Sequence, residues 1–402
     1  MLKESSKKIT GAVRYLIAAI VTGVLVGGID AVFGRVLLAL SDFRTGHVWY
    51  LLPFLPGAGL VIVWLYHFFS EESLKGMGLV LETGQGKRGH IPLVLIPLVT
   101  VGTWMTHLFG GSAGREGVAV QIGAVVGHTL EDRFHISGNK KTMLITGMAA
   151  GFGGLFQTPL AAAFFAMEVI TAGKMEYAAM LSAITASYAA SFTSHWLGLE
   201  KFAVNIGAKL TISDRNVFAA IIIFGIIFGL TGRVFAGLLK WSKEKMSHIF
   251  VNPYARIGIV SIPLVILLAV LYQGRYCGLG TNLIAAAFDG QTVCYYDWII
   301  KLLLTVLTLS IGFQGGEVTP LFSMGATLGI VLGGICGLPV EPCAALGYAA
   351  VFGSATNTLI APILIGMEVF GTGNALAFVL VCAIAYAVNG NRSIYSAQNV
   401  LD

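Results

Sequence analysis

The sequence predicts an all-α protein that crosses a membrane many times, and three observations carry that prediction. Of its 402 residues, 56% are hydrophobic and only 11% are charged, which is a balance typical of membrane proteins. Apolar stretches of roughly 15 to 25 residues recur along the chain, and a helix of about 20 such residues spans a bilayer. The 51 glycines fit helices that pack closely or break inside the membrane.

The expected membrane-crossing segments follow these apolar stretches in chain order. They are residues 16–40, 50–69, 91–109, 142–170, 176–198, 216–239, 255–272, 297–313, 319–338 and 374–389. Two other apolar stretches, 114–130 and 357–370, are too short to cross, because glycines bound the first and Pro362 interrupts the second. We therefore expect one transmembrane domain over residues 1–402, with broken helices among its spans and no cytoplasmic regulatory domain.

Charged residues and cysteines indicate the orientation of the chain in the membrane and the partners to expect. Lys3, Lys7, Lys8 and Arg14 precede the first span, so the positive-inside rule places the N-terminus in the cytoplasm of a multi-pass protein. The net charge of +5 is concentrated in such flanks, which suits lipid headgroups and gives no reason to expect a nucleic-acid partner. The five cysteines show no metal-ligand spacing, so we expect them to be packing residues and expect neither a metal site nor a cofactor.

An internal repeat divides the chain into two halves. Residues 147–173 and 347–373 align without a gap and are identical at 11 of 27 positions, more than shared apolar composition explains. A hydrophilic break at 198–215 separates a first half of about 11–198 from a second half of about 213–402. Repeated halves with interrupted hydrophobic segments are typical of transporters, which bind substrate between broken-helix ends. If each half crosses the membrane an odd number of times, the halves are inverted and form one transport domain.

Glycine-rich helix starts are the candidate binding elements. The stretch GGSAGREGVAVQIGAVVG at 110–127 places Glu116 where a helix should begin, and GGEV at 315–318 places Glu317 at the matching point of the second half. Free N–H groups at such ends attract anions. A carboxylate there can occupy the anion's position, and protonation would release it, so Glu116 could be both gate and proton carrier. Gly76-Met77-Gly78 is a third start of this kind.

These motifs resemble the CLC family of chloride channels and anion/proton antiporters. GREGVAVQIG is similar to that family's GREGP-x-VQ-x-G, FGGLFQTPLAAAFFAMEV to its FNAPLAG-x-x-F-x-x-E, and GGEVTPLFSMGATLG to its GG-x-F-x-P-x-x-x-x-G. The resemblance implies the CLC fold, with two inverted repeat halves and broken, re-entrant helices. It also implies a homodimer, a gating role for Glu116 and an inner-gate role for Tyr395, which we expect at another helix start.

Departures from the common CLC pattern look like the CLC-F branch of fluoride/proton antiporters. Met77 stands where chloride-selective members have the serine of GSGIP, Val118 replaces the proline after GREG, and Glu317 replaces an apolar residue. Val169 stands where proton-coupled chloride exchangers often carry a second glutamate. The branch implies that inward proton movement drives fluoride out through a microbial plasma membrane.

The expected site has one titrating residue and a set of anion contacts. Glu116 is expected to gate and to transfer protons, while a protonated Glu317 would donate to fluoride and Thr319 would offer a hydroxyl. The anion contacts are expected to be Gly76, Met77, Gly78, Arg115, Gly117, Val118, Gly316, Glu317, Val318, Thr319 and Tyr395. The expected partners are fluoride, protons, membrane lipid and a second copy of the chain.

Several of these residues have simpler interpretations. Met77 could be ordinary packing, Arg115 could pair or extend toward the interface, and Tyr395 could be an interfacial anchor. Glu317 could make a structural hydrogen bond to backbone amides. Glu168 and Glu368, which match each other in the repeat, favour twin structural hydrogen bonds over transport.

Two other functions remain open from the residues. A passive CLC-type halide channel keeps the fold and loses the proton coupling, and the missing glutamate at Val169 favours it slightly. An intramembrane serine hydrolase would use Ser112 of GGSAG with His107 nearby. That motif needs a preceding strand and an oriented base, whereas Ser112 lies between apolar segments, so we expect no enzyme.

Overall fold

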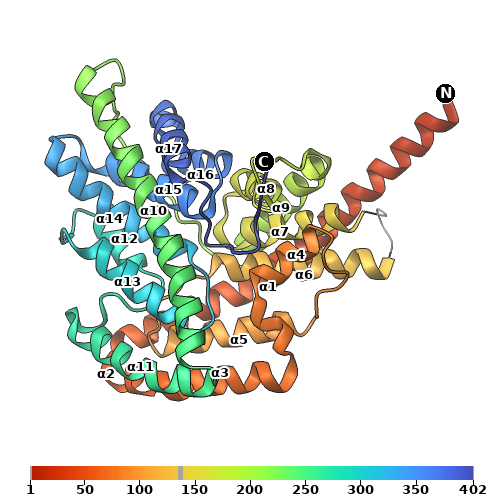
Figure 1. Ribbon diagram of the computed structural model, residues 1–402. Helices are drawn as coiled ribbons and strands as arrows, with labels where there is room; N and C mark the ends of the chain where they lie inside the picture. Colours follow the sequence, from red (N-terminus) through yellow and green to blue (C-terminus); the bar gives the residue numbers. More distant parts are fainter. Residues whose placement is uncertain (1, 135–138, 402) are drawn as a thin grey trace.

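The computed structural model describes residues 2–134 and 139–401, which form an almost entirely helical protein (Figure 1). The helices of the first half are α1 (Leu2–Gly46), α2 (Val48–Leu51), α3 (Leu55–Phe69), α4 (Met77–Gly84), α5 (Leu95–Leu108), α6 (Glu116–Phe134), α7 (Lys140–Phe156), α8 (Pro159–Glu168) and α9 (Met180–Trp196). Those of the second are α10 (Arg215–Ile249), α11 (Pro253–Val270), α12 (Thr281–Phe288), α13 (Asp297–Ser310), α14 (Val318–Cys336), α15 (Val340–Thr356), α16 (Ile360–Phe370) and α17 (Ala375–Asn389).

Six described helical segments are long and apolar enough to cross a membrane. They are Val13–Gly46, Val48–Phe69, Arg215–Ile249, Pro253–Val270, Val318–Cys336 and Thr372–Asn389. Shorter apolar helices lie between them, among them Leu95–Leu108, Pro159–Glu168 and Ile360–Phe370. The mixture of full spans and short helices confirms the all-α membrane fold.

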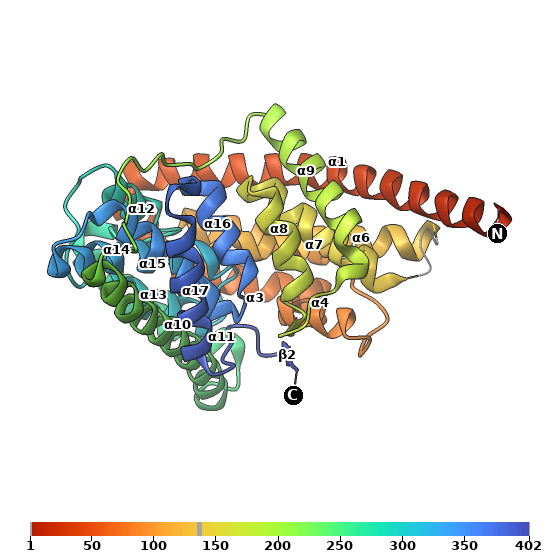
Figure 2. The same ribbon diagram turned by 90° about the horizontal axis from the view of Figure 1, so that it is seen from above.

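The two halves use the same packing scheme. In the first half α1 packs on α7 and α9, and in the second α10 packs on α15 and α17. Each half also has a tightly packed hairpin, α6 with α7 and α14 with α15. Seen from above, α4 and α6–α9 lie on one side and α10 and α12–α15 on the other, and α8 and α16 meet between them (Figure 2).

Glycine permits the close approach in both hairpins. A Cβ atom added at Gly123 would overlap the carbonyl oxygen of Gly147, and one at Gly325 would overlap that of Gly347. No side chain fits at those separations, so the backbones themselves touch. This is the packing through small residues that helices use in lipid, where the hydrophobic effect between helices is absent.

The expected single span at 142–170 is wrong, because the chain breaks there. α7 ends at Phe156, Gln157 adopts a left-handed φ of 57°, and α8 begins at Pro159. Asn357 breaks the second half at the equivalent place with a φ of 55°. A left-handed residue ends a helix, and a proline starts the next one without needing an N–H acceptor.

Glu168 and Glu368 link the halves reciprocally. The Glu168 carboxylate accepts hydrogen bonds from the backbone amides of Leu359, Ile360 and Ala361 at the start of α16. The Glu368 carboxylate accepts from Leu160 N at 3.2 Å and Ala161 N at 2.8 Å at the start of α8. Each carboxylate thus satisfies free amides of the other half, and the twin structural hydrogen bonds are confirmed.

The C-terminal segment returns to the molecule as an extended chain. Strand β2 (Asn399–Val400) pairs in parallel with β1 (Thr171–Ala172), which follows α8. The helix start expected at Tyr395 does not form. The amide of Ile394 instead donates to Ala355 O at 2.8 Å, and the Gln398 side chain donates to Val169 O at 2.9 Å. These contacts with α8 and α15 replace intrahelical bonds and fix the position of Tyr395.

Candidate functional site

The glycine-rich starts of α6 and α14 meet at the centre of the molecule. Gly114 N donates to Gly316 O at 2.5 Å, and Gly316 N donates to Gly114 O at 2.8 Å, so the two loops form a short antiparallel bridge. A Cβ atom at Gly117 would lie 3.6 Å from the Cα of Gly316 and 3.9 Å from Oε2 of Glu317. The two carboxyl-bearing helix starts are therefore adjacent, as a shared site requires. The expected match of Glu116 with Glu317 is wrong by one residue, because Gly114 pairs with Gly316 and the helices begin at Glu116 and Val318.

Glu116 is bound through its carboxylate at the N-terminus of α14. Its side chain is 1% exposed, and its Oε2 accepts from the Thr319 hydroxyl at 2.5 Å and from the Thr319 amide at 3.1 Å. Arg115 N also donates to Oε2 at 3.3 Å, and Arg115 Nε lies 3.8 Å from Oε1. The carboxylate thus occupies the position at a helix N-terminus that an anion would take.

Glu317 faces a different partner. Its Oε1 lies 3.7 Å from Nζ of Lys243, a residue of α10 whose side chain is 48% exposed. Sequence reasoning had no means of pairing these residues, since Lys243 lies within a basic stretch that reads as a solvated helix end. Val318 is buried at the first position of α14, so it contributes a backbone amide and packing.

Tyr395 and Met77 are two further side chains expected at the site. The Tyr395 hydroxyl is buried and makes no hydrogen bond with any described residue, and the charges of Glu317 and Glu116 both act on it. Met77 is buried at the first position of α4. Gly76 precedes it with a φ of 50°, which favours glycine. The arrangement leaves the Tyr395 hydroxyl unpaired among the described residues.

The remaining expected residues are placed around these starts. Gly78 faces the extended C-terminal segment, where a Cβ atom would meet Ala397 at 4.0 Å, and Val118 is fully buried in α6. Gln121, which sequence reasoning missed, lies one turn farther along α6. Its buried Oε1 has no hydrogen-bond partner among the described residues and is 3.3 Å from a Cβ built at Gly76. The sequence signal that could have identified Gln121 is a single side-chain amide in an otherwise apolar helix.

A cavity of about 230 Å³ leads away from Glu116. Its lining residues are Arg115, Glu116, Leu155, Phe156, Glu200, Phe202, Thr281, Ile284, Ala285, Thr319 and Tyr348. A second cavity of about 680 Å³ opens near the C-terminal end of α1 and shares Thr281 and Ala285 with the first. Arg44 and Arg275 line the second cavity. Asp42 also lines the second cavity, and the two shared residues place the cavities next to each other.

Lys301 of α13 holds the loop before Glu116. It is fully buried, and its Nζ donates to Ser112 Oγ at 2.9 Å, Tyr276 O at 3.1 Å and Gly278 O at 2.6 Å. All three of its N–H donors are used, so a buried lysine is tolerated here without a carboxylate partner. Sequence reasoning missed Lys301 because nothing links it locally to the loop.

The same contacts argue against a serine nucleophile. Ser112 is fully buried and its Oγ pairs with Thr305 Oγ1 at 2.9 Å. The two ring nitrogens of His107 lie at hydrogen-bond distance from Thr103 O and Ala113 O, away from the serine hydroxyl. The hydrolase alternative therefore has neither an oriented base nor an accessible nucleophile.

Asp30 of α1 is a further buried charge that sequence reasoning did not single out. Neither carboxylate oxygen makes a hydrogen bond with a described residue, and the charge of Arg115 acts on it. A Cβ atom at Gly154 would lie 2.5 Å from Asp30 Oδ2. Nε and Nη1 of Arg115 are likewise buried without a hydrogen-bond partner among the described residues, so neither Asp30 nor Glu116, at 3.8 Å, satisfies the guanidinium.

Two related halves whose broken helices bring buried carboxylates to helix N-termini define a membrane protein of the ion-transporting class. A family model described as voltage gated chloride channel matches residues 58–390, and the chain belongs to this CLC family. The resemblance inferred from GREGV, GGEVTP and the repeat is thereby confirmed.

Relatives and solved structures agree with this assignment. The chain is 34% identical over 394 residues to a chloride/fluoride channel protein of Pseudomonas syringae pv. tomato, covering 96% of this chain and 86% of that one. It is 26% identical to an H(+)/Cl(-) exchange transporter, ClcA, of Yersinia pseudotuberculosis, covering 95% and 86%. A crystal structure of a CLC-type fluoride/proton antiporter has a TM-score of 0.94 and 51% identity, covering 96% and 98%. A slow cyanobacterial Cl-/H+ antiporter shares the fold at a TM-score of 0.82 and 20% identity, covering 95% and 96%.

Proposed function

We propose that this chain is a secondary transporter that exchanges fluoride for protons. The observation that carries the proposal is the Glu116 carboxylate bound by the Thr319 amide and hydroxyl at the mouth of α14, beside a second carboxylate on Glu317. A titratable group that occupies the anion's position makes anion binding and protonation mutually dependent. The likeness to a fluoride/proton antiporter at 51% identity supports fluoride as the anion.

In the proposed cycle, Glu116 and fluoride compete for the same helix N-terminus. Protonation of Glu116 removes its charge and weakens its charge-assisted bonds to Thr319, since such bonds are about twice as strong as neutral ones. The neutral side chain then swings into the 230 Å³ cavity, and fluoride takes its place. Deprotonation and return of the side chain displace the fluoride, so inward proton movement drives fluoride export.

The donors proposed for fluoride are those that lack other partners. The Tyr395 hydroxyl is unpaired among the described residues, and a protonated Glu317 carboxyl would donate a strong hydrogen bond. Backbone amides at Met77, Gly78, Gly117 and Val318 would complete the site, with Gly76 and Gly316 permitting close approach of the backbone. Arg115, whose Nε and Nη1 are buried without a hydrogen-bond partner among the described residues, is a further proposed donor, and Val118 and the Met77 side chain would line the path.

We also propose the domain organisation, the membrane location and the orientation of the transporter. Residues 1–402 would act as one transport domain with halves of about 11–198 and 213–402, in a plasma membrane with a cytoplasmic N-terminus. Exposed aromatic residues on α9, namely Tyr188, Phe192 and Trp196, support cover by lipid or by a second copy in a homodimer.

Simultaneous fluoride and pH recording from liposomes containing the purified protein tests the function. An outward fluoride gradient should drive protons inward against their own gradient, and a proton gradient should drive fluoride. A passive halide channel would let fluoride run down its gradient without moving protons uphill, and that result would overturn the proposal. The Pseudomonas relative is described as a channel, which makes this distinction the decisive one.

A further inference from the structure

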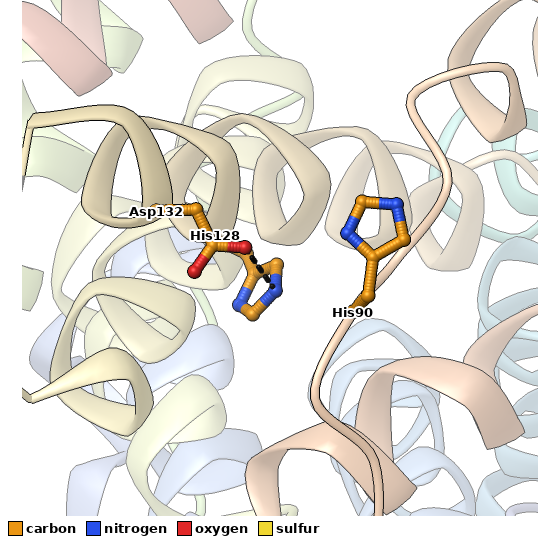
Figure 3. A group of neighbouring side chains, drawn as sticks. All are labelled: His90, His128 and Asp132. Carbon is orange, nitrogen blue, oxygen red and sulfur yellow. Dashed lines mark ion pairs between the residues drawn. The ribbon is translucent and has the colours of Figure 1, made fainter.

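We propose that His90, His128 and Asp132 form a binding site for one divalent transition-metal ion of the zinc class (Figure 3). His128 and Asp132 are four residues apart on the last turns of α6, and His90 lies in the connection between α4 and α5. One ligand atom from each side chain lies within 4.8 Å of the others. Imidazole nitrogens and a carboxylate oxygen are ligands that Zn²⁺ accepts, whereas Mg²⁺ and Ca²⁺ prefer oxygen alone.

The distances suit a tetrahedral ion after a small movement. With metal–ligand bonds of about 2.0–2.1 Å, neighbouring ligand atoms around zinc are about 3.3 Å apart. His128 Nε2 and Asp132 Oδ2 are already 3.2 Å apart. The His90 ring faces the His128 ring at a centroid separation of 6.4 Å and is exposed, so it is free to turn inward. Water reaching the exposed side would supply the fourth ligand.

The two proposed ligands on α6, His128 and Asp132, already face each other. Lys140 Nζ lies 2.5 Å from Asp132 Oδ1, which leaves Oδ2 directed at His128. His128 is 1% exposed, and neither ring nitrogen makes a hydrogen bond of normal geometry with a described residue, although the Gly89 backbone lies close. An ion could therefore bind between His128 and Asp132 without breaking a hydrogen bond of either ring nitrogen.

His90 is also held near the site. Ile91, the next residue, is fully buried, and Arg88 forms ion pairs with Glu82 at 2.5 Å and with Glu72. These contacts hold the segment on α4 and on the residues before it, while the exposed His90 ring stays free to rotate. A bound ion would join the α4–α5 connection to the end of α6, the helix that begins with Glu116.

The site differs from what the cysteine spacing led us to expect. Cysteine spacing can reveal only sites with thiolate ligands. This site uses two histidines and a carboxylate from segments about 40 residues apart, which is too far for a short sequence motif. The site is also separate from the proposed anion path. It lies toward the end of α6 that shares a side of the molecule with the start of α1 (Figure 1), whereas Glu116 begins the same helix at the centre.

Titration of the purified full-length chain with Zn²⁺ and Co²⁺ at neutral pH tests the proposal. We expect one ion per chain, Co²⁺ absorption of a four- or five-coordinate site without a thiolate band, and weaker binding on acidification because protons compete for the imidazoles. His90→Ala replaces an exposed ring, so the variant should fold normally. Its metal affinity should fall about tenfold or more, since mutating even residues that only hydrogen-bond to metal ligands lowers affinity about 10- to 100-fold. Asp132→Asn should act in the same direction.

The matched control is His195→Ala, which removes another exposed histidine, on α9, and should leave metal affinity unchanged. His128→Ala should also abolish binding, but this ring is buried and its removal can disturb folding, so the decision rests on His90→Ala and Asp132→Asn. Unchanged zinc affinity in both of those variants would overturn the proposal. Failure of the unmodified chain to bind, or a thiolate band showing that cysteines hold the ion, would also overturn it.

Discussion

Two pairs of carboxylates near helix starts behave differently in this protein. Glu168 and Glu368 occupy equivalent positions in the two halves and make equivalent contacts, each accepting backbone amides at the start of a helix in the other half. Glu116 and Glu317 have no such equivalence, because Glu116 is the first residue of α6 whereas Glu317 precedes Val318, the first residue of α14. Glu116 is bound by Thr319 and Glu317 faces Lys243. The duplicated framework therefore carries one symmetric pair of carboxylates and two further acids that are not repeat equivalents.

The difference separates structural from functional acids. Releasing Glu168 or Glu368 would leave several buried amides without acceptors, so both carboxylates are fixed. Glu116 lies against a cavity into which it can move, and its strongest contact is a single threonine. We infer that the carboxylates that hold the fold are duplicated between the halves, whereas each acid of the proposed site occurs in one half only.

The largest expected effect follows from neutralising Glu116. Glu116→Gln keeps the size of the side chain but cannot carry a proton, so coupled exchange should fall to the background of protein-free liposomes. The assay is fluoride-driven proton uptake in proteoliposomes. Glu341→Gln, at an exposed position on α15, should retain normal exchange. Proton pumping at the normal rate by Glu116→Gln would remove this residue from the mechanism.

The symmetric pair should affect stability instead of transport. Glu168→Gln and Glu368→Gln each weaken charge-assisted hydrogen bonds to helix-start amides, and hydrogen bonds to charged groups contribute about 1.5–3 kcal/mol. We expect each variant to lose about 2 kcal/mol of unfolding free energy in detergent, by similar amounts, while exchange per folded molecule stays normal. A stable Glu168→Gln protein without exchange would break the proposed distinction.

Glu317 should affect selectivity more than coupling. Glu317→Ala removes the proposed donor to fluoride, and loss of one strong hydrogen bond of about 1.4 kcal/mol corresponds to roughly a tenfold change. We therefore expect the ratio of fluoride to chloride transport to fall about tenfold while protons remain coupled. Parallel flux measurements with the two halides give this ratio, and an unchanged ratio would exclude Glu317 from the site.

The smallest effect is expected from the partner of Glu317. Lys243 is half exposed and lies 3.7 Å from the carboxylate, and exposed ion pairs contribute only about 0–1 kcal/mol. Lys243→Gln should therefore change fluoride transport less than about fivefold and reduce its sensitivity to added salt, as the same flux assay would show. An effect equal to that of Glu317→Ala would mean that the ion pair itself forms the selective element.

Much of this framework is predictable because its signals are local. The repeat, the glycine-rich starts and the placement of Glu116 follow from residues that lie next to one another in the chain. The break at Gln157 is not predictable in this way, because nothing in the local sequence indicates that this glutamine adopts a left-handed conformation. Only Gln157 and Thr158 separate the two helices, so the apolar stretch looks continuous. The helix expected at Tyr395 was wrong because distant carbonyls on α8 and α15 bind that segment.

The missed site residues share a physical reason. Lys243 and Lys301 come from helices remote in sequence from the glutamate and the loop that they contact. Burial of Lys301 depends on two carbonyls and one hydroxyl converging on it, an arrangement that only the folded chain creates. Charge in a membrane helix marks such residues as important, but does not identify their partners.

The pairing of β2 with β1 has a consequence for assembly of the protein. Residues 391–401 are synthesised after all the helices that surround Glu116, and they seat Tyr395 by binding α8 and α15. The cytoplasm-facing wall proposed for the anion path is thus built after the rest of that path. A chain shortened before residue 391 would keep every described helix and lack this wall, so this side of the proposed path depends on an extended segment and not on a membrane helix.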